Sequence, residues 1–153
     1  MVVDIYAALR ESHELQRSLC TRLLRAKAKD GHARRDALYA LRVELDAHAS
    51  AEERFLYAVI LLDDMGLKSS RHALAEHHEI EEDVETLQKT DPKGVAWREN
   101  AKTLTRRVRH HLKEEEGKFF QVSGKILGPR QKLTLARRYS KDYARIKKKL
   151  TTS

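Results

Sequence analysis

Cysteine, proline and glycine are scarce in this sequence, and long hydrophobic runs are missing from it. One cysteine, Cys20, stands among 153 residues, so an internal disulfide is excluded and no oxidising compartment is needed. No apolar stretch reaches the roughly 18 residues of a membrane span, and the N-terminus lacks the basic and apolar segments of a signal peptide. We therefore expect a soluble, cytoplasmic protein in which Cys20 is a small core residue.

The scarcity of proline and glycine also argues against a structure built from many turns. Charged residues make up 35% of the chain, and the helix-favouring residues Ala, Leu, Glu, Lys and Arg dominate its composition. A chain of this length folds as one domain that buries roughly two-thirds of the surface exposed by its unfolded form. The composition predicts an all-α protein.

Acidic residues are scarce in one part of the chain. Residues 129–153 hold nine Lys or Arg and a single Asp, which accounts for the whole formal charge of +8. We predict a formally neutral helical bundle at 1–128 and a basic amphipathic helix at 129–153 that docks on the same domain without a part in its chemistry. A concentrated basic patch leaves nucleic acid or an anionic surface open as a partner, although no recognised motif supports it.

Helix-breaking residues divide the chain into five segments. They cluster at Asp30-Gly31, from Met65-Gly66 to Ser70, from Thr90 to Gly94 and at Gly128-Pro129. Helices are expected near 3–29, 34–64, 70–89, 94–124 and 130–149. Four of them form an antiparallel up-down bundle, with the fifth in addition.

The helix expected at 34–64 has an apolar seam that two polar residues interrupt. Its positions follow one another at alternating steps of three and four: Leu38, Leu41, Leu45, His48, Glu52, Phe55, Val59 and Leu62. An unpartnered glutamate facing a core costs on the order of several kcal/mol, so Glu52 needs a compensating group.

The other three bundle helices repeat this feature. At 94–124 the seam runs Trp97, Ala101, Leu104, Val108, His111, Glu115, Phe119 and Val122, again with a His and a Glu. At 70–89 the seam contains His77 after Ala73, and at 3–29 it contains His13 after Leu9. Each of four helices therefore turns one histidine inward.

This pattern favours a metal site. Residues four apart lie on one helix face about 6 Å apart, so each His-Glu pair can point at one locus, and coordination neutralises the buried charge. A single histidine is more simply explained by an ordinary hydrogen bond, but six matching seam positions are not. The neighbours Glu53, His78, His110 and Glu116 fall off the seams and are expected to matter little, and His32 and His72 are expected to be solvated.

Two other metal-site classes fit the sequence less well. A ferritin-like di-iron bundle needs Glu-x-x-His motifs and a zinc hydrolase needs His-Glu-x-x-His, and the sequence contains neither. Imidazole and carboxylate ligands together favour iron, with manganese as the alternative.

The sequence resembles the hemerythrin-like, or HHE cation-binding, domain family over roughly residues 3 to 122. The resemblance rests on a His in the first helix and on HASAEE, EHHEI and HLKEEE in the next three. It implies two iron ions (Fe2+/Fe3+) bridged by the carboxylates of Glu52 and Glu115 and by an oxo or hydroxo group. It also implies terminal imidazoles from four residues: His13, His48, His77 and His111.

One position departs from the family pattern. Oxygen-carrying hemerythrins have a second histidine one turn before the residue that matches His77, and here that position is Ala73. Water, Glu81, His72 or His32 remain candidates for the place. An extra open coordination position suits reaction with a small molecule better than reversible oxygen storage.

Three functions are consistent with these residues. The first is a non-haem di-iron protein that binds or senses a small molecule such as oxygen, nitric oxide or peroxide. The second is a di-iron enzyme that decomposes peroxide or takes part in iron-centre repair, with Tyr57 or Cys20 as conceivable redox participants. The third is a helical interaction module that acts through its basic tail.

Overall fold

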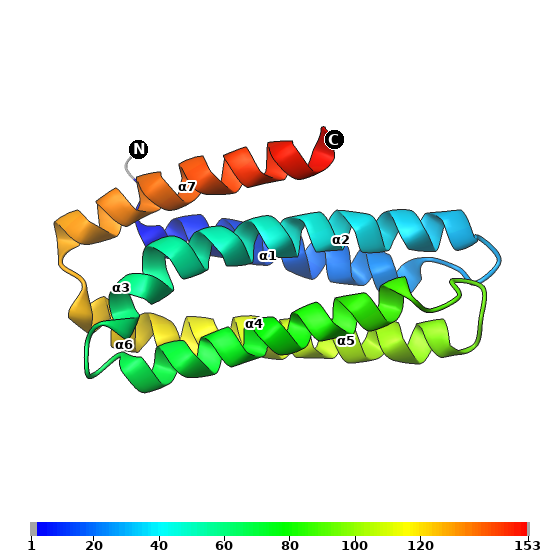
Figure 1. Cartoon of the computed structure of the whole chain (residues 1–153), viewed down its shortest axis with the longest axis horizontal. Helices are drawn as coiled ribbons and strands as arrows, with labels where there is room; N and C mark the ends of the chain where they lie inside the picture. Colours follow the sequence, from blue (N-terminus) through cyan, green and yellow to red (C-terminus); the bar gives the residue numbers. More distant parts are fainter. Residues whose placement is uncertain (1–2, 153) are drawn as a thin grey trace.

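The computed structural model describes residues 3–152, which form five helical rods joined by short loops (Figure 1). In chain order their segments are α1 (Ile5–Arg25), α2 (Gly31–Glu52), η1 (Glu53–Tyr57), α3 (Ala58–Leu61), α4 (Leu67–Gln88), α5 (Ala96–Glu114), η2 (Glu115–Phe119), α6 (Phe120–Ile126) and α7 (Pro129–Thr151). The second rod contains α2, η1 and α3, and the fourth contains α5, η2 and α6. The five helices predicted from the sequence are confirmed.

The rods begin and end where the sequence carries breaking and capping residues. Asp4 and Asp30 accept hydrogen bonds from backbone N–H groups in the first turns of α1 and α2, which satisfies donors that have no partner within a helix. Pro129 occupies the first turn of α7, where its missing N–H costs nothing.

Four rods form the predicted antiparallel bundle. The rod of α1 lies against α2, α4 lies against α5, and α1 also contacts α5 across the bundle. The fifth rod, α7, runs along the outside of the α1 and α2 pair (Figure 1). None of the helices in residues 3–152 is long and apolar enough to cross a membrane.

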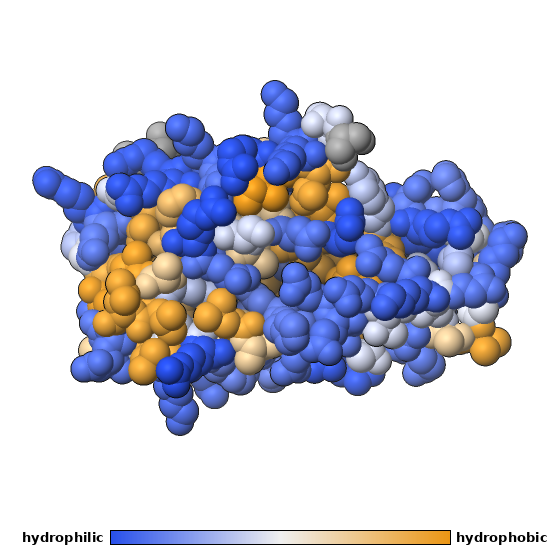
Figure 2. Space-filling model, in the orientation of Figure 1, coloured by the Kyte–Doolittle hydropathy of each residue, from blue (hydrophilic) through white to orange (hydrophobic). Residues whose placement is uncertain are grey.

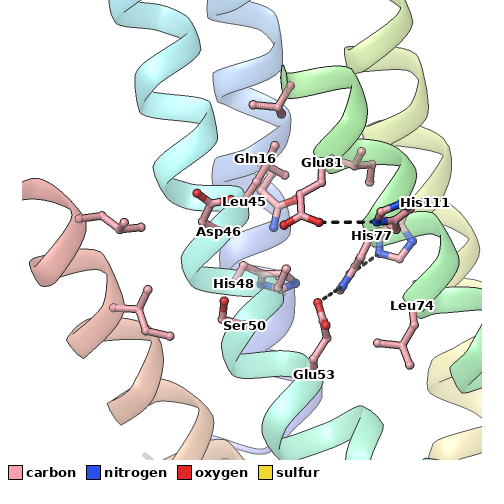
Figure 3. Close-up of a pocket in the computed structure, with 16 residues that line it drawn as sticks. Gln16, Leu45, Asp46, His48, Ser50, Glu53, Leu74, His77, Glu81 and His111 are labelled. Carbon is pink, nitrogen blue, oxygen red and sulfur yellow. Dashed lines mark hydrogen bonds and ion pairs between the residues drawn. The ribbon is translucent and has the colours of Figure 1, made fainter. Parts of the chain in front are cut away.

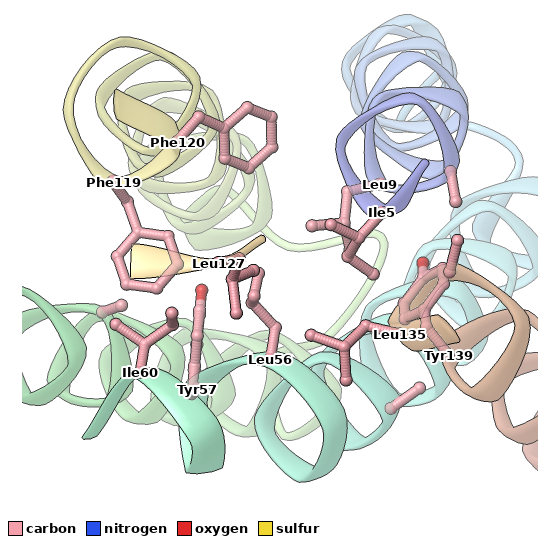
Figure 4. Packing of buried hydrophobic residues seen from close by; sticks show 14 residues of the cluster. Ile5, Leu9, Leu56, Tyr57, Ile60, Phe119, Phe120, Leu127, Leu135 and Tyr139 are labelled. Atoms are coloured by element: carbon pink, nitrogen blue, oxygen red, sulfur yellow. The ribbon is translucent and has the colours of Figure 1, made fainter. Parts of the chain in front are cut away.

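The core consists of two hydrophobic clusters. One cluster gathers Leu9, Leu56 and Phe119 around the bundle end formed by α3, α6 and the start of α7 (Figure 4). The other gathers residues such as Cys20 and Trp97 toward the opposite end. Burial raises the pKa of the Cys20 thiol to about 11, so the thiol stays protonated and Cys20 packs as a small core residue.

The two π-helical segments change which residues face the core. In η1 the N–H of Ala58 bonds to the carbonyl of Glu53, five residues back, and η2 repeats this between Phe120 and Glu115. Each wide turn holds one extra residue and shifts the following positions around the helix axis. Both segments begin directly after or at a seam glutamate.

The shift makes part of the predicted second seam wrong. Its first half is buried as expected, but beyond η1 Leu62 is 87% exposed, whereas Leu56, Tyr57 and Ile60 are buried. A seam drawn with constant helical periodicity cannot include the extra residue of a π turn.

Helix α7 docks through an apolar face and exposes its charges. The predicted row Leu133, Ala136, Tyr139, Tyr143, Ile146 and Leu150 is buried or half-buried along its length, with Leu135 added. Asp142 is also buried, where Arg54 and Arg145 donate hydrogen bonds to its carboxylate. The outer edge of α7 is hydrophilic, and hydrophobic groups lie beneath it (Figure 2).

The phase shift at η1 can be tested by replacing leucine with alanine at two positions. Leu56→Ala should lower the free energy of unfolding by about 2–5 kcal/mol because it leaves a cavity in the core. Leu62→Ala should change it by no more than about 0.5 kcal/mol, as expected of an exposed side chain. Chemical denaturation measures both, and equal losses would contradict the shifted phase.

Candidate metal centre

The six residues predicted from the seams meet in one polar layer between the two hydrophobic clusters. Their donor atoms fall into two groups in which every ligand atom lies within 4.8 Å of the others. The first group is His13, His48, Glu52 and Glu115, and the second is Glu52, His77, His111 and Glu115. Each group takes one imidazole from each of two helices, and both groups include the same two carboxylates.

The first group is buried completely. The Nε2 atom of His13 lies 3.3 Å from Oε1 of Glu115, and the Nε2 atom of His48 lies 3.3 Å from Oε1 of Glu52. The rings of His13 and His48 meet edge to face, with centroids 5.0 Å apart. Two imidazole nitrogens therefore face two carboxylates in an almost fully buried space, which His48 alone of this group borders on the side of the larger cleft described below.

The second group has the same composition and lies on the other side of the carboxylates. The Nε2 atom of His77 lies 3.3 Å from Oε1 of Glu52, and that of His111 lies 3.6 Å from Oε2 of Glu115. The two Nε2 atoms are 3.2 Å apart. Glu52 and Glu115 thus stand between two imidazole pairs, which is the geometry of carboxylates that bridge two cations.

Several of these buried atoms have no hydrogen-bond partner in the described part of the chain, although they lie close to one another. They are Nε2 of His13, Nε2 of His48, both carboxylate oxygens of Glu52 and Oε1 of Glu115. Buried polar atoms are almost always hydrogen-bonded, and charged ones are costly when they are not. Five such atoms that converge on one point fit cations held between them.

Each of the four histidines is oriented by a hydrogen bond at its other ring nitrogen. The Nδ1 partners are Glu116 for His13 at 2.7 Å, Tyr139 for His48 at 2.8 Å, Glu53 for His77 at 2.9 Å and Glu76 for His111 at 2.9 Å. An ionised carboxylate can only accept, so the Nδ1 atoms that face Glu carry protons. In the neutral ring this leaves Nε2 with its lone pair aimed at the centre, as metal ligation requires.

The charges of the centre hold one another in their ionised forms. Burial lowers the pKa of His13, but the carboxylates of Glu115 and Glu116 outweigh it and raise the pKa to about 9. Burial raises the pKa of Glu52, yet His48 and the neighbouring imidazoles hold it well below its usual value. A cation that enters must therefore displace a proton from His13, which couples metal binding to proton release.

The expectation that Glu53 and Glu116 matter little does not agree with this geometry. Each follows a seam glutamate directly, and each reaches a histidine of a different rod: Glu53 reaches His77 and Glu116 reaches His13. The sequence carried a signal for them, since both seam glutamates are followed by a second Glu. A seam includes only the residues on one face of a helix, and these two glutamates lie beside that face. They were therefore not predicted to matter.

Helix α7, predicted to dock on the bundle, also contacts a histidine of the centre. The hydroxyl of Tyr139 lies at Nδ1 of His48. Next to it, Glu44 is buried and accepts hydrogen bonds from Ser12 of α1 and from Tyr143 and Lys147 of α7. These contacts tie α7 to the helices that carry His13 and His48.

Tyr57 points into the centre, although it falls off the predicted seam. Its hydroxyl donates a short hydrogen bond to Glu115 and lies 3.4 Å from Nε2 of His77. Burial and the charges of Glu115 and Glu52 raise the pKa of this phenol well above its ordinary value, so it remains a donor. The extra residue of η1 turns Tyr57 inward.

The side chains named as candidates for the ligand missing at Ala73 lie at the surface. His32 is exposed and pairs with Asp36. Glu81 is exposed, and His72 pairs with Glu114 on the outside of α4 and α5. Among the described side chains named for this place, none reaches the centre, whereas the phenol of Tyr57 does.

Two cavities reach the centre from the surface. A cleft of about 590 Å³ between α2, α4 and the end of α7 exposes His48, His77 and His111, and Figure 3 shows His48 facing the other two across it. A smaller cavity of about 250 Å³ between α4 and the α5–η2 rod ends at His111 and Glu115. His13 lines neither cavity.

Comparison with known proteins agrees with the family resemblance predicted from the sequence motifs. The hemerythrin HHE cation binding domain family matches residues 4–122. A crystal structure of a hemerythrin HHE cation binding domain-containing protein from Mycobacterium kansasii is similar in fold, with a TM-score of 0.86 and 18% sequence identity over 96% of this chain and 89% of the other. An identity this low shows the fold alone. No curated protein matches the chain.

The outer hydrogen-bond partners can be tested by their effect on metal affinity. Glu53→Ala, Glu116→Ala and Tyr139→Phe should each weaken metal binding about 10- to 100-fold, because the imidazole they orient becomes free to turn. Competition titration with a chelator measures the affinity. Two matched controls, Glu82→Ala and Tyr39→Phe, alter exposed side chains and should leave it unchanged. Equal affinities throughout would show that these contacts do not support the centre.

Proposed function

Because the chain belongs to the hemerythrin HHE cation-binding family, as its motifs predicted, we propose that it holds two iron ions and binds or senses a small molecule at them. Oxygen, nitric oxide and peroxide are the candidate ligands. The observation that carries this proposal is the pair of ligand groups that share Glu52 and Glu115. The unpartnered buried oxygens of these carboxylates support it.

The residues fit a pair of iron ions. Mixed imidazole and carboxylate donors suit Fe2+ and Fe3+, and two shared carboxylates hold two cations close without leaving buried negative charge unpaired. When bound, a ferrous pair supplies two electrons to a small molecule. Glu52 and Glu115 would bridge the ions, His13 and His48 would bind one of them, and the remaining two histidines would bind the other.

The two positions differ in access, and this indicates where a small molecule would bind. The larger cleft reaches both histidines of the second group, His77 and His111, but only His48 of the first, since His13 lines neither cavity; His111 also lines the smaller one. Ala73 leaves room on the same side, since it lines the smaller cavity where a longer side chain would project. A small molecule would therefore approach the His77 and His111 position.

Tyr57 provides a hydrogen-bond donor at that position. Its phenol is buried among hydrophobic side chains, keeps its proton and lies beside both His77 and Glu115. A fixed donor in a site shielded from water interacts more strongly with developing negative charge than the same group does in solution. Tyr57 is suited to orient a small oxygen-containing ligand by donating a hydrogen bond to it.

The iron content of the air-exposed protein tests the proposed centre. Wild-type protein should contain two irons per chain and absorb from the near ultraviolet into the visible range, whereas zinc would leave it colourless. Glu52→Ala and Glu115→Ala should lose the iron and the absorption, because each carboxylate is shared by both ions. Two irons retained in both variants would show that these residues do not bridge.

Two neighbouring histidine pairs give a control for helical phase. His77→Ala and His111→Ala should reduce iron occupancy strongly, while His78→Ala and His110→Ala should not. The latter two side chains are 71% and 67% exposed and pair with surface carboxylates. Equal losses within either pair would place the centre on another face of these helices.

A second candidate function is enzymatic decomposition of peroxide, and the position of Tyr57 favours it. If the iron-loaded protein turns over peroxide, Tyr57→Phe should lower kcat by on the order of 10²-fold, since it removes a fixed hydrogen-bond donor but keeps the ring. Tyr39→Phe, at a 47% exposed residue, is the matched control. A stable oxygen or nitric oxide adduct without peroxide turnover would favour binding or sensing instead.

A further inference from the structure

A second set of potential ligands lies on the surface of the bundle, outside the centre described above. His72 and Glu76 stand one turn apart on α4, and Glu114 faces them from α5. The Nε2 atom of His72 lies 2.7 Å from Oε1 of Glu114 and 3.6 Å from Oε1 of Glu76. One imidazole and two carboxylates thus offer ligand atoms within 4.8 Å of one another.

This surface cluster shares a wall with the buried centre. Oε1 of Glu76 faces His72 on its outer side, and on its inner side it lies 2.9 Å from Nδ1 of His111. Glu114 is likewise the residue directly before Glu115. The surface cluster and the second ligand group are therefore separated by the thickness of one side chain.

The smaller cavity joins the surface cluster to the centre. Its outer part is lined by His72, Glu76 and Glu114, and its inner end by His111 and Glu115. Glu115 is 3% exposed, and its Oε2 lies 3.6 Å from Nε2 of His111 at this inner end. The cavity therefore leads from exposed ligands to a buried carboxylate whose negative charge attracts cations.

We propose that His72, Glu76 and Glu114 form a surface site for a divalent cation such as Fe2+, from which the ion passes along the smaller cavity to the buried centre. Imidazole and carboxylate ligands suit first-row divalent ions. The side chain of His72 is 57% exposed, so water completes the coordination and the ion leaves readily. The passage inward rests on the proposed di-iron function, whereas the surface site does not.

Two lysines line the same cavity as the surface cluster. Lys68 and Lys118 are both exposed and have long, flexible side chains. Their positive charges weaken the attraction of the cavity for a cation. A weak site that releases its ion is what transfer requires, whereas a tight one would hold the ion at the surface.

The simpler explanation is an ion-pair network without a metal. His72 and His110 both contact Glu114, and such exposed pairs contribute little to stability. The two explanations differ in the number of cations that the protein binds. With ion pairs alone, only the two cations of the proposed di-iron centre would bind, whereas the surface site adds a third.

Anaerobic titration of the metal-free, full-length protein with Co2+ tests the site. Wild-type protein should bind two Co2+ ions tightly and a third more weakly. His72→Ala and Glu114→Gln should lose the third ion and keep the first two. His78→Ala, which removes another exposed histidine of α4, should bind three. A wild-type stoichiometry of two, or a third ion retained by His72→Ala, would overturn the surface site.

Glu52→Ala separates this proposal from the di-iron proposal. It should lose the two tight ions and keep the weak one if the surface site stands by itself. If wild-type protein bound one weak ion and no tight pair, the di-iron proposal would fail while the surface site would hold. If Glu52→Ala lost the weak ion together with the tight pair, the surface site would not be independent of the buried centre, and the proposal would be overturned.

The kinetics of Fe2+ uptake test the passage inward. Stopped-flow loading under anaerobic conditions should be several-fold slower in His72→Ala than in wild-type protein, with the same final content of two irons in the centre. His78→Ala should load at the wild-type rate. Equal rates for all three proteins would overturn the transfer role.

Discussion

The burial of two carboxylates in the middle of a helical core is the constraint on which the rest of this structure depends. Glu52 and Glu115 are almost fully buried, and atoms of both lack hydrogen-bond partners in the described chain. Such groups persist only where opposite charge compensates them. Four imidazoles, each oriented by an outer hydrogen bond, surround them and create a place for cations.

The backbone is adapted to these two residues. Each of the two long rods that carry a seam glutamate contains a π turn there, η1 after Glu52 and η2 from Glu115. The wide turn lets one helix present the glutamate to the centre and the next glutamate to a histidine of a neighbouring rod. In η1 it also turns Tyr57 inward. Because of the π turn, one helix supplies more side chains to the centre than a regular α-helix would.

The fifth rod packs against the polar layer of the bundle. Helix α7 covers the α1 and α2 pair, holds His48 through Tyr139 and contributes Ile146 and Leu150 to the wall of the larger cleft. Most of its basic residues face outward, whereas Lys147 reaches the buried Glu44. Charge composition alone separates α7 from the neutral bundle, but packing joins them, because the apolar face of an amphipathic helix must be buried.

Sequence patterns predicted the all-helical fold, the five helices and the meeting of His13, His48, Glu52, His77, His111 and Glu115. Helix-breaking residues and the spacing of the seams encode these features, and both depend on residues only a few positions apart. Other features became visible only in the folded chain: the inward turn of Tyr57, the pairing of Glu53 and Glu116 with distant histidines, and the contact of Tyr139 with His48. These features depend on π turns that break the helical period and on contacts between residues 24 to 103 positions apart. The periodic pattern of a single helix cannot predict contacts between different helices, so these residues meet only when the helices pack.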